Sequence, residues 1–205
     1  MTCCKPRVSR LFPLVLLFLI FPAKAEAHMA LQGANEILSG ALHPLTTPVH
    51  VLILIGLALL LGQQIPLKLK QPMLVFAPLS AIALVLTTIG RGTELYQPLM
   101  IGIALCIAIL VALEKKIPPT LLCSFCALAG ISIGLDSGLQ SDSTTVITKT
   151  LLGTWITINA VVGYLALCVS NGAEKPWARI AMRVVGSWIV AISLMVLAFS
   201  LRKIQ

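Results

Sequence analysis

The chain has 205 residues, of which 58% are hydrophobic and only 11% are charged, and its mean hydropathy is +1.00. Soluble domains contain about 45–50% apolar and about 25% charged residues, so this composition excludes a soluble globular protein and indicates a lipid bilayer as its surroundings. The formal net charge of +8 does not indicate a nucleic-acid partner. Four basic residues lie in the N-terminal segment and most of the others lie in short loops, as topology determinants of membrane proteins do.

Residues 1–27 have the pattern of a secretory signal peptide. A basic segment comes first, an apolar core follows, and small residues precede the expected cleavage point. Cleavage after Ala27 would make His28 the mature N-terminus, outside the cytoplasm, whereas cleavage after Ala25 would retain two more residues. The alternative is an uncleaved anchor helix.

A short helix and a helix break are predicted next. Residues 29–42 form a weakly amphipathic pattern, and the chain from Pro44 to Pro48 is predicted to break the helix before a long apolar run begins. Pro48 suits the first turn of the following helix, with Thr46 or Thr47 as its N-cap.

Two of the three histidines, His43 and His50, flank this predicted break. Glu36, His43 and His50 are spaced by seven residues, so on one uninterrupted helix they would share a stripe. The two histidines would then stand roughly 10 Å apart, too far to share one ion, and only the break could bring them together. A neutral imidazole at the edge of a bilayer is a usable metal ligand or proton-transfer group. The alternative is that both histidines only bond to neighbouring backbone.

Six long apolar runs predict the fold class. We expect an all-α polytopic membrane protein with six transmembrane helices after the signal peptide, the first preceded by a short broken helix, in one membrane-embedded domain over 28–205. Glycines within the runs permit close helix approach. The distribution of basic loop residues predicts both ends outside the cytoplasm, in a bacterial-type inner or thylakoid-like membrane. The runs lie at about 48–63, 73–89, 98–113, 118–135, 150–169 and 181–201.

Other candidate metal ligands lie outside the histidine stretch. Asp136 ends the fourth run, where a carboxylate near water needs no function. Cys123 and Cys126 lie on nearly one helix face, and paired thiols suit a soft ion, although buried cysteines more often serve packing. A free amine and imidazole at His28 could also chelate an ion together. The fifth run carries polar residues that we interpret as hydrogen-bond partners between helices: Thr154, Thr157, Asn159 and Tyr164.

The stretch from Ser39 to Gln64, taken with the signal peptide and the histidine beside its cleavage site, resembles the HupE/UreJ family. The signature of that family is HPLxGxDH at the start of the first span. Thr47 stands where the signature has glycine and Val49 where it has aspartate, and the fourth run lacks the family's second histidine cluster. The matching positions are His43, Pro44, Leu45 and His50.

The resemblance implies a small membrane protein with about six spans, associated with hydrogenase or urease systems and with nickel or cobalt uptake. We therefore expect no enzymatic activity, and a protein that binds or passes a transition-metal ion (nickel or cobalt, with copper or zinc as alternatives) from the outer side. The alternative is a non-transporting subunit or assembly factor with a membrane-protein partner or an oligomeric state. The expected ligands are His43, His50, His28, Asp136 and Glu36.

Overall fold

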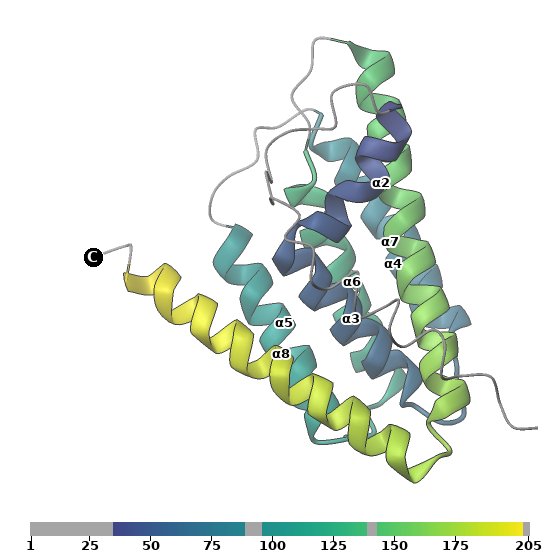
Figure 1. Cartoon of the computed structure of the whole chain (residues 1–205). Helices are drawn as coiled ribbons and strands as arrows, with labels where there is room; N and C mark the ends of the chain where they lie inside the picture. Colours follow the sequence, from purple (N-terminus) through teal and green to yellow (C-terminus); the bar gives the residue numbers. More distant parts are fainter. Residues whose placement is uncertain (1–34, 89–95, 139–142, 203–205) are drawn as a thin grey trace, which may run out of the picture. The chain divides into compact units, whose positions relative to one another are not determined.

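The computed structural model describes residues 35–88, 96–138 and 143–202, and within these ranges every element is an α-helix. The chain divides into two units, Met1–Gln32 and Gly33–Gln205, and all described residues belong to the second. The predicted signal peptide and His28 lie outside the described residues. The helices are α2 (Glu36–Thr46), α3 (Pro48–Gly62), α4 (Lys70–Leu86), α5 (Tyr96–Ala112), α6 (Pro119–Asp136), α7 (Thr144–Gly172) and α8 (Pro176–Arg202) (Figure 1).

Each of the six predicted apolar runs is a helix, and the apolar helices indicate a protein embedded in a lipid bilayer. By length and composition, α6, α7 and α8 are candidate membrane spans, and α2 with α3 would form a fourth if counted as one span bent by 76°. The helices α4 and α5 have 17 residues each. A helix of that length extends about 26 Å, less than the hydrocarbon core of about 30 Å, so the six-span arrangement stays a prediction.

The break between α2 and α3 falls at a single residue, Thr47. Pro48 begins α3 as predicted, but the hydroxyl of Thr47 donates to the carbonyl oxygen of His43 at 3.0 Å instead of capping α3. The prediction that the break begins at Pro44 is wrong, because α2 continues to Thr46 with Pro44 inside it. Pro44 has no N–H to donate to the carbonyl oxygen of Gly40, and the hydroxyl of Thr154 on α7 donates to this oxygen instead.

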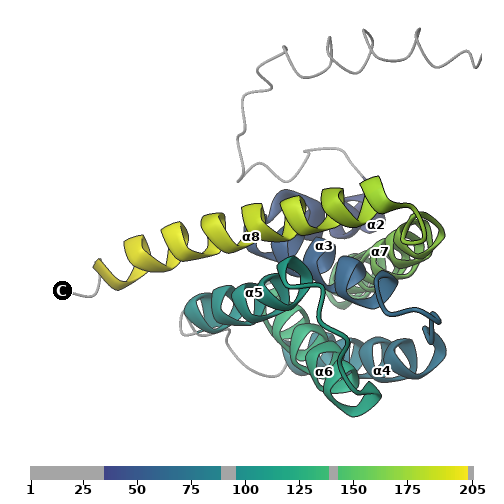
Figure 2. The same ribbon diagram turned by 90° about the horizontal axis from the view of Figure 1, so that it is seen from below.

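The central helix of the described bundle is α3. Eleven of its fifteen residues are buried, and it contacts α2, α5, α6, α7 and α8. Figure 2 shows α3 among these neighbours, with α5 beside α8 and α6 beside α4. Leu54, Leu57 and Leu60 are fully buried in the core, so α3 provides a rigid apolar support for the residues at its two ends.

Glycines allow two pairs of helices to approach closely. On α6, a Cβ added at Gly130 or Gly134 would press against the backbone and side chains of α4. At the interface of α2 with α7, a Cβ added at Gly40 or Gly153 would overlap the backbone of the facing helix. Small residues permit this kind of packing between membrane helices, and here they fix the position of α2 along α7 (Figure 1).

Candidate metal site at the break between α2 and α3

His50 is the third residue of α3 and its side chain is completely buried. Its Nε2 lies 2.9 Å from Oδ2 of Asp136, the last residue of α6. A carboxylate is disfavoured at the C-terminal end of its own helix and favoured near the N-terminal end of another, because of the helix macrodipoles. Asp136 therefore gains from lying beside the first turn of α3 as well as from its bond to His50.

The bond to Asp136 determines which nitrogen of His50 is available. When the carboxylate is ionised and the imidazole is neutral, Nε2 carries the proton and donates it, and Nδ1 keeps a free lone pair. Nδ1 is buried and has no hydrogen-bond partner among the described residues. Metal-ligating histidines commonly bind the ion through one nitrogen while the other donates to a carboxylate that fixes the ring. His50 and Asp136 have this arrangement.

The bend brings the ring of His43 next to the ring of His50. The two ring centroids are 5.6 Å apart and the ring planes are inclined by 78°, whereas a straight helix would separate the two residues by roughly 10 Å. An ion about 2.0–2.1 Å from a ring nitrogen lies roughly 3.2 Å from the centroid of that ring. Two imidazoles that share an ion therefore have centroids up to roughly 6.4 Å apart, and the observed separation fits this limit.

The two histidines differ in exposure. His43, in the last turns of α2, is exposed, whereas His50 is buried beneath it at the start of α3. An ion reaching this place would therefore meet His43 first and His50 second.

Glu36, one of the expected ligands, lies away from the histidines. It is the first residue of α2, seven residues and about 10 Å along the helix from His43. Its carboxylate is 3.5 Å from the Nζ of Lys149 on α7. This ion pair ties the start of α2 to α7 and does not contribute to the pair formed by His43 and His50.

The two thiols of α6 are also distant from the histidine pair. Cys126 is buried and Cys123 is half-buried, and Cys126 precedes Asp136 by ten residues, about 15 Å along the helix. Within the described ranges, no three or more His, Cys, Asp or Glu side chains form a group that could hold an ion. The two imidazoles are thus a partial ligand set, which water or a further group must complete.

The polar residues of α7 have different partners. The prediction of an interhelical bond is confirmed for Thr154, whose hydroxyl donates to the carbonyl oxygen of Gly40 at 2.9 Å. For Asn159 the prediction is wrong among the described residues. Its amide donates to the carbonyl oxygen of Trp155, one turn earlier on the same helix. The sequence offered no signal that Gly40 would be the acceptor.

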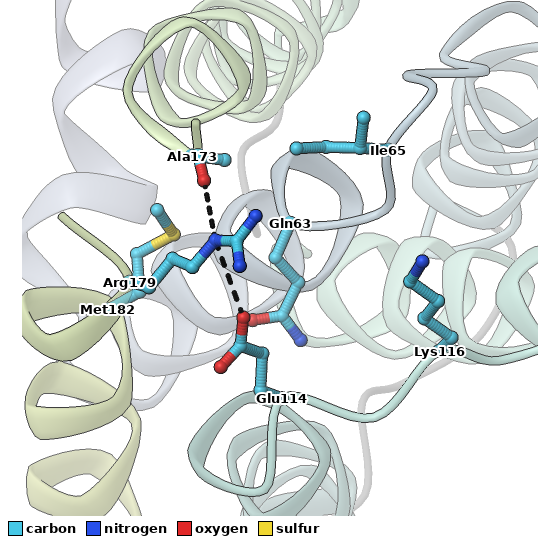
Figure 3. Close-up of a pocket in the computed structure, with 7 residues that line it drawn as sticks. All are labelled: Gln63, Ile65, Glu114, Lys116, Ala173, Arg179 and Met182. Carbon is cyan, nitrogen blue, oxygen red and sulfur yellow. Dashed lines mark hydrogen bonds and ion pairs between the residues drawn. The ribbon is translucent and has the colours of Figure 1, made fainter. Parts of the chain in front are cut away.

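A second polar region lies at the other end of α3 (Figure 3). Gln63 follows His50 by thirteen residues, about 20 Å along the helix. Here the Nε of Arg179 donates to the carbonyl oxygen of Ala173 at 2.8 Å and lies 3.7 Å from Oε1 of Glu114. These bonds hold the turn between α7 and α8 against the end of α5. A cavity of about 210 Å³ lies in this second polar region. It is lined by Gln63, Ile65, Glu114, Lys116, Ala173, Arg179 and Met182.

The chain between the two polar regions is apolar. Residues 51–62 contain only aliphatic side chains and glycine, and most of them are buried. The region around Arg179 has one carboxylate next to two basic side chains, a charge balance that does not favour a cation. The candidate metal site is therefore the histidine pair at the start of α3.

Comparison with known proteins gives one match. A family model described as HupE / UreJ protein matches residues 16–196. No curated protein and no solved structure matches the chain. The family match includes the whole stretch from α2 to α7 and most of α8, and therefore both histidines of the candidate site.

Proposed function

Because the chain belongs to the HupE/UreJ family, we propose that it binds a transition-metal ion at the break between α2 and α3 and passes the ion across the membrane. Membership indicates an accessory or transport role connected with nickel or cobalt. The observation that carries the proposal is the buried Nδ1 of His50, which has no hydrogen-bond partner among the described residues. The centroid of this ring lies 5.6 Å from the centroid of the His43 ring.

In this proposal each residue has a distinct role. His43, being exposed, captures the ion, and His50 binds it through Nδ1. Asp136 orients His50 through Nε2 and remains outside the ligand set. Imidazole nitrogens suit nickel, copper and zinc alike, so the site by itself favours no single one of these metals, and nickel or cobalt follows from the family.

We propose that the ion enters from the outer side of the membrane. Basic loop residues are concentrated on the cytoplasmic side of membrane proteins. Here Lys68, Lys115 and Lys116 lie near the C-terminal end of α3, which supports an outer position for the histidine pair at the other end of this helix. Two imidazoles hold an ion less tightly than a closed structural site with four protein ligands. Such weak holding suits an ion that must be released again.

The test compares wild-type protein with the His43→Ala/His50→Ala double variant. We expect the purified double variant to bind nickel, cobalt and zinc at least 100-fold more weakly by calorimetry, because it lacks both nitrogen ligands, and cells that produce it to accumulate no more metal than cells without the protein. The control is Cys123→Ala/Cys126→Ala, which removes the distant thiols and should keep wild-type affinity. Equal binding and accumulation by the double-histidine variant and the wild type would refute the proposal.

A second candidate function is a non-transporting membrane subunit. The observation that favours it is the loss of ligands from the family signature, with Val49 in place of the aspartate and no second histidine cluster in the fourth run. Large apolar side chains exposed on α8, among them Ile180, Trp188 and Phe199, would face lipid or such a partner. A stoichiometric membrane partner that co-purifies in mild detergent with a metal-free protein would favour this function. A monodisperse protein that binds metal would reject it.

A further inference from the structure

Pro44 leaves one carbonyl of α2 without its usual donor. In an α-helix the N–H of each residue donates to the carbonyl oxygen four residues earlier, so an N–H at residue 44 would donate to the carbonyl oxygen of Gly40. Proline has no N–H, and the carbonyl oxygen of Gly40 therefore lacks its usual donor within α2. Proline also disfavours the helical conformation at the preceding residue, which here is His43. The last turn of α2, with one of the two histidines, is thus locally weak.

A hydroxyl from another helix supplies the missing bond. The Oγ1 of Thr154 lies 2.9 Å from the carbonyl oxygen of Gly40, and the Thr154 residue is only 1% exposed. The same hydroxyl lies 3.1 Å from the carbonyl oxygen of Thr150 on its own helix. That second carbonyl belongs to a continuous helix with its own N–H donor, whereas the carbonyl of Gly40 depends on Thr154.

The contact requires the backbones of α2 and α7 to lie very close together. Gly40 faces the backbone of Thr150, and Gly153 faces the backbone at Ile37, so closely that a Cβ at either glycine would overlap the facing chain. The ion pair of Glu36 with Lys149 lies one turn further toward the start of α2. The carbonyl oxygen that accepts the Thr154 bond belongs to Gly40, three residues before His43.

We propose that Thr154 is a positioning residue for the histidine pair. By donating to the carbonyl that Pro44 leaves free, it holds the last turn of α2 at the angle where the ring of His43 meets the ring of His50. The inference rests on the proposed metal function for its functional consequence, but the position of α2 can be measured without any metal.

The experiment uses full-length protein in detergent and three variants at α7. Thr154→Val removes the hydroxyl and keeps the shape, Thr154→Ser keeps the hydroxyl, and Thr157→Val is a matched control on a half-buried threonine of the same helix. Hydrogen exchange of the α2 amides is measured without metal, and zinc or nickel affinity is measured by calorimetry. We expect Thr154→Val to raise exchange in α2 alone and to weaken metal binding about tenfold, about 1.4 kcal/mol. Thr154→Ser and Thr157→Val should resemble the wild type.

A rescue experiment tests the route through the Gly40 carbonyl. In Pro44→Ala/Thr154→Val the new N–H at residue 44 can donate to Gly40, so α2 protection should return to the wild-type level. Failure of this rescue, unchanged α2 exchange in Thr154→Val, or raised exchange in all helices would each overturn the inference. If Thr154→Val loosens α2 but the wild type binds no metal, the positioning of α2 stands and the proposed metal function fails.

Discussion

Gly40→Ala will cost the protein about 3 kcal/mol of stability or more, the upper end of what overpacking usually costs. The added Cβ would overlap the backbone of Thr150 on α7, and backbone, unlike the end of a flexible side chain, cannot turn aside. The helices must separate, which also breaks the bond of Thr154 to the Gly40 carbonyl. Thermal unfolding in detergent measures the loss.

Gly102→Ala is the matched control for this prediction. Gly102 lies within α5, and a Cβ added there meets no atom within 4 Å. Alanine is favoured over glycine inside a helix by about 0.5–1 kcal/mol, so this variant should unfold at the same temperature as the wild type or slightly higher. Equal unfolding temperatures for Gly40→Ala and Gly102→Ala would contradict the close packing of α2 on α7.

Asp136→Ala will weaken metal binding by about 10- to 100-fold, the usual effect of losing the carboxylate behind a ligating histidine. Without Asp136 the Nε2 of His50 has no acceptor, the ring can turn, and the proton is no longer held away from Nδ1. Asp136→Asn should lie between Asp136→Ala and the wild type, because its amide oxygen can still accept the bond from Nε2 but carries no charge. Calorimetric titration with nickel or zinc measures all three proteins.

The control for Asp136 is Glu114→Gln, which neutralises a carboxylate near the opposite end of α3. It should leave metal affinity within about twofold of the wild type, since it lies too far from His50 to act on the ring. If Asp136→Ala binds metal as tightly as Glu114→Gln, Asp136 has no part in the site.

The helices themselves could be predicted from the sequence because membrane helices depend on local properties. A run of apolar residues must satisfy its backbone hydrogen bonds internally, and each of the six runs predicted in this way coincides with a helix. The helix α7 is longer than predicted, since it begins six residues earlier and ends three residues later. The extra turns carry polar residues such as Lys149, which no measure of hydrophobicity assigns to an apolar run.

The partners within the site could not be predicted in the same way. Asp136 and His50 are 86 residues apart in the chain, and no periodicity links positions on different helices. Likewise Pro44 was expected to end α2, but the helix continues to Thr46. The carbonyl oxygen of Gly40 accepts a bond from Thr154, 114 residues away, which no local pattern could reveal. Val49 is buried where the family signature has an aspartate, and the carboxylate beside His50 comes from another helix.

The bond between Gly40 and Thr154 also fixes how deep the start of the site lies. Thr154 follows Lys149 by five residues, about 7 Å along α7, and the uncharged stretch after Lys149 runs about 20 residues to Val169, about 30 Å, which matches the hydrocarbon core. If α7 crosses the bilayer with Lys149 at one surface, this bond lies roughly a quarter of the way through the hydrocarbon core. A full transmembrane voltage of 100 mV is worth about 2.3 kcal/mol per charge, so a doubly charged ion at that depth gains or loses about 1.2 kcal/mol. Binding of an ion at the proposed site would consequently be coupled to the electric field across the membrane.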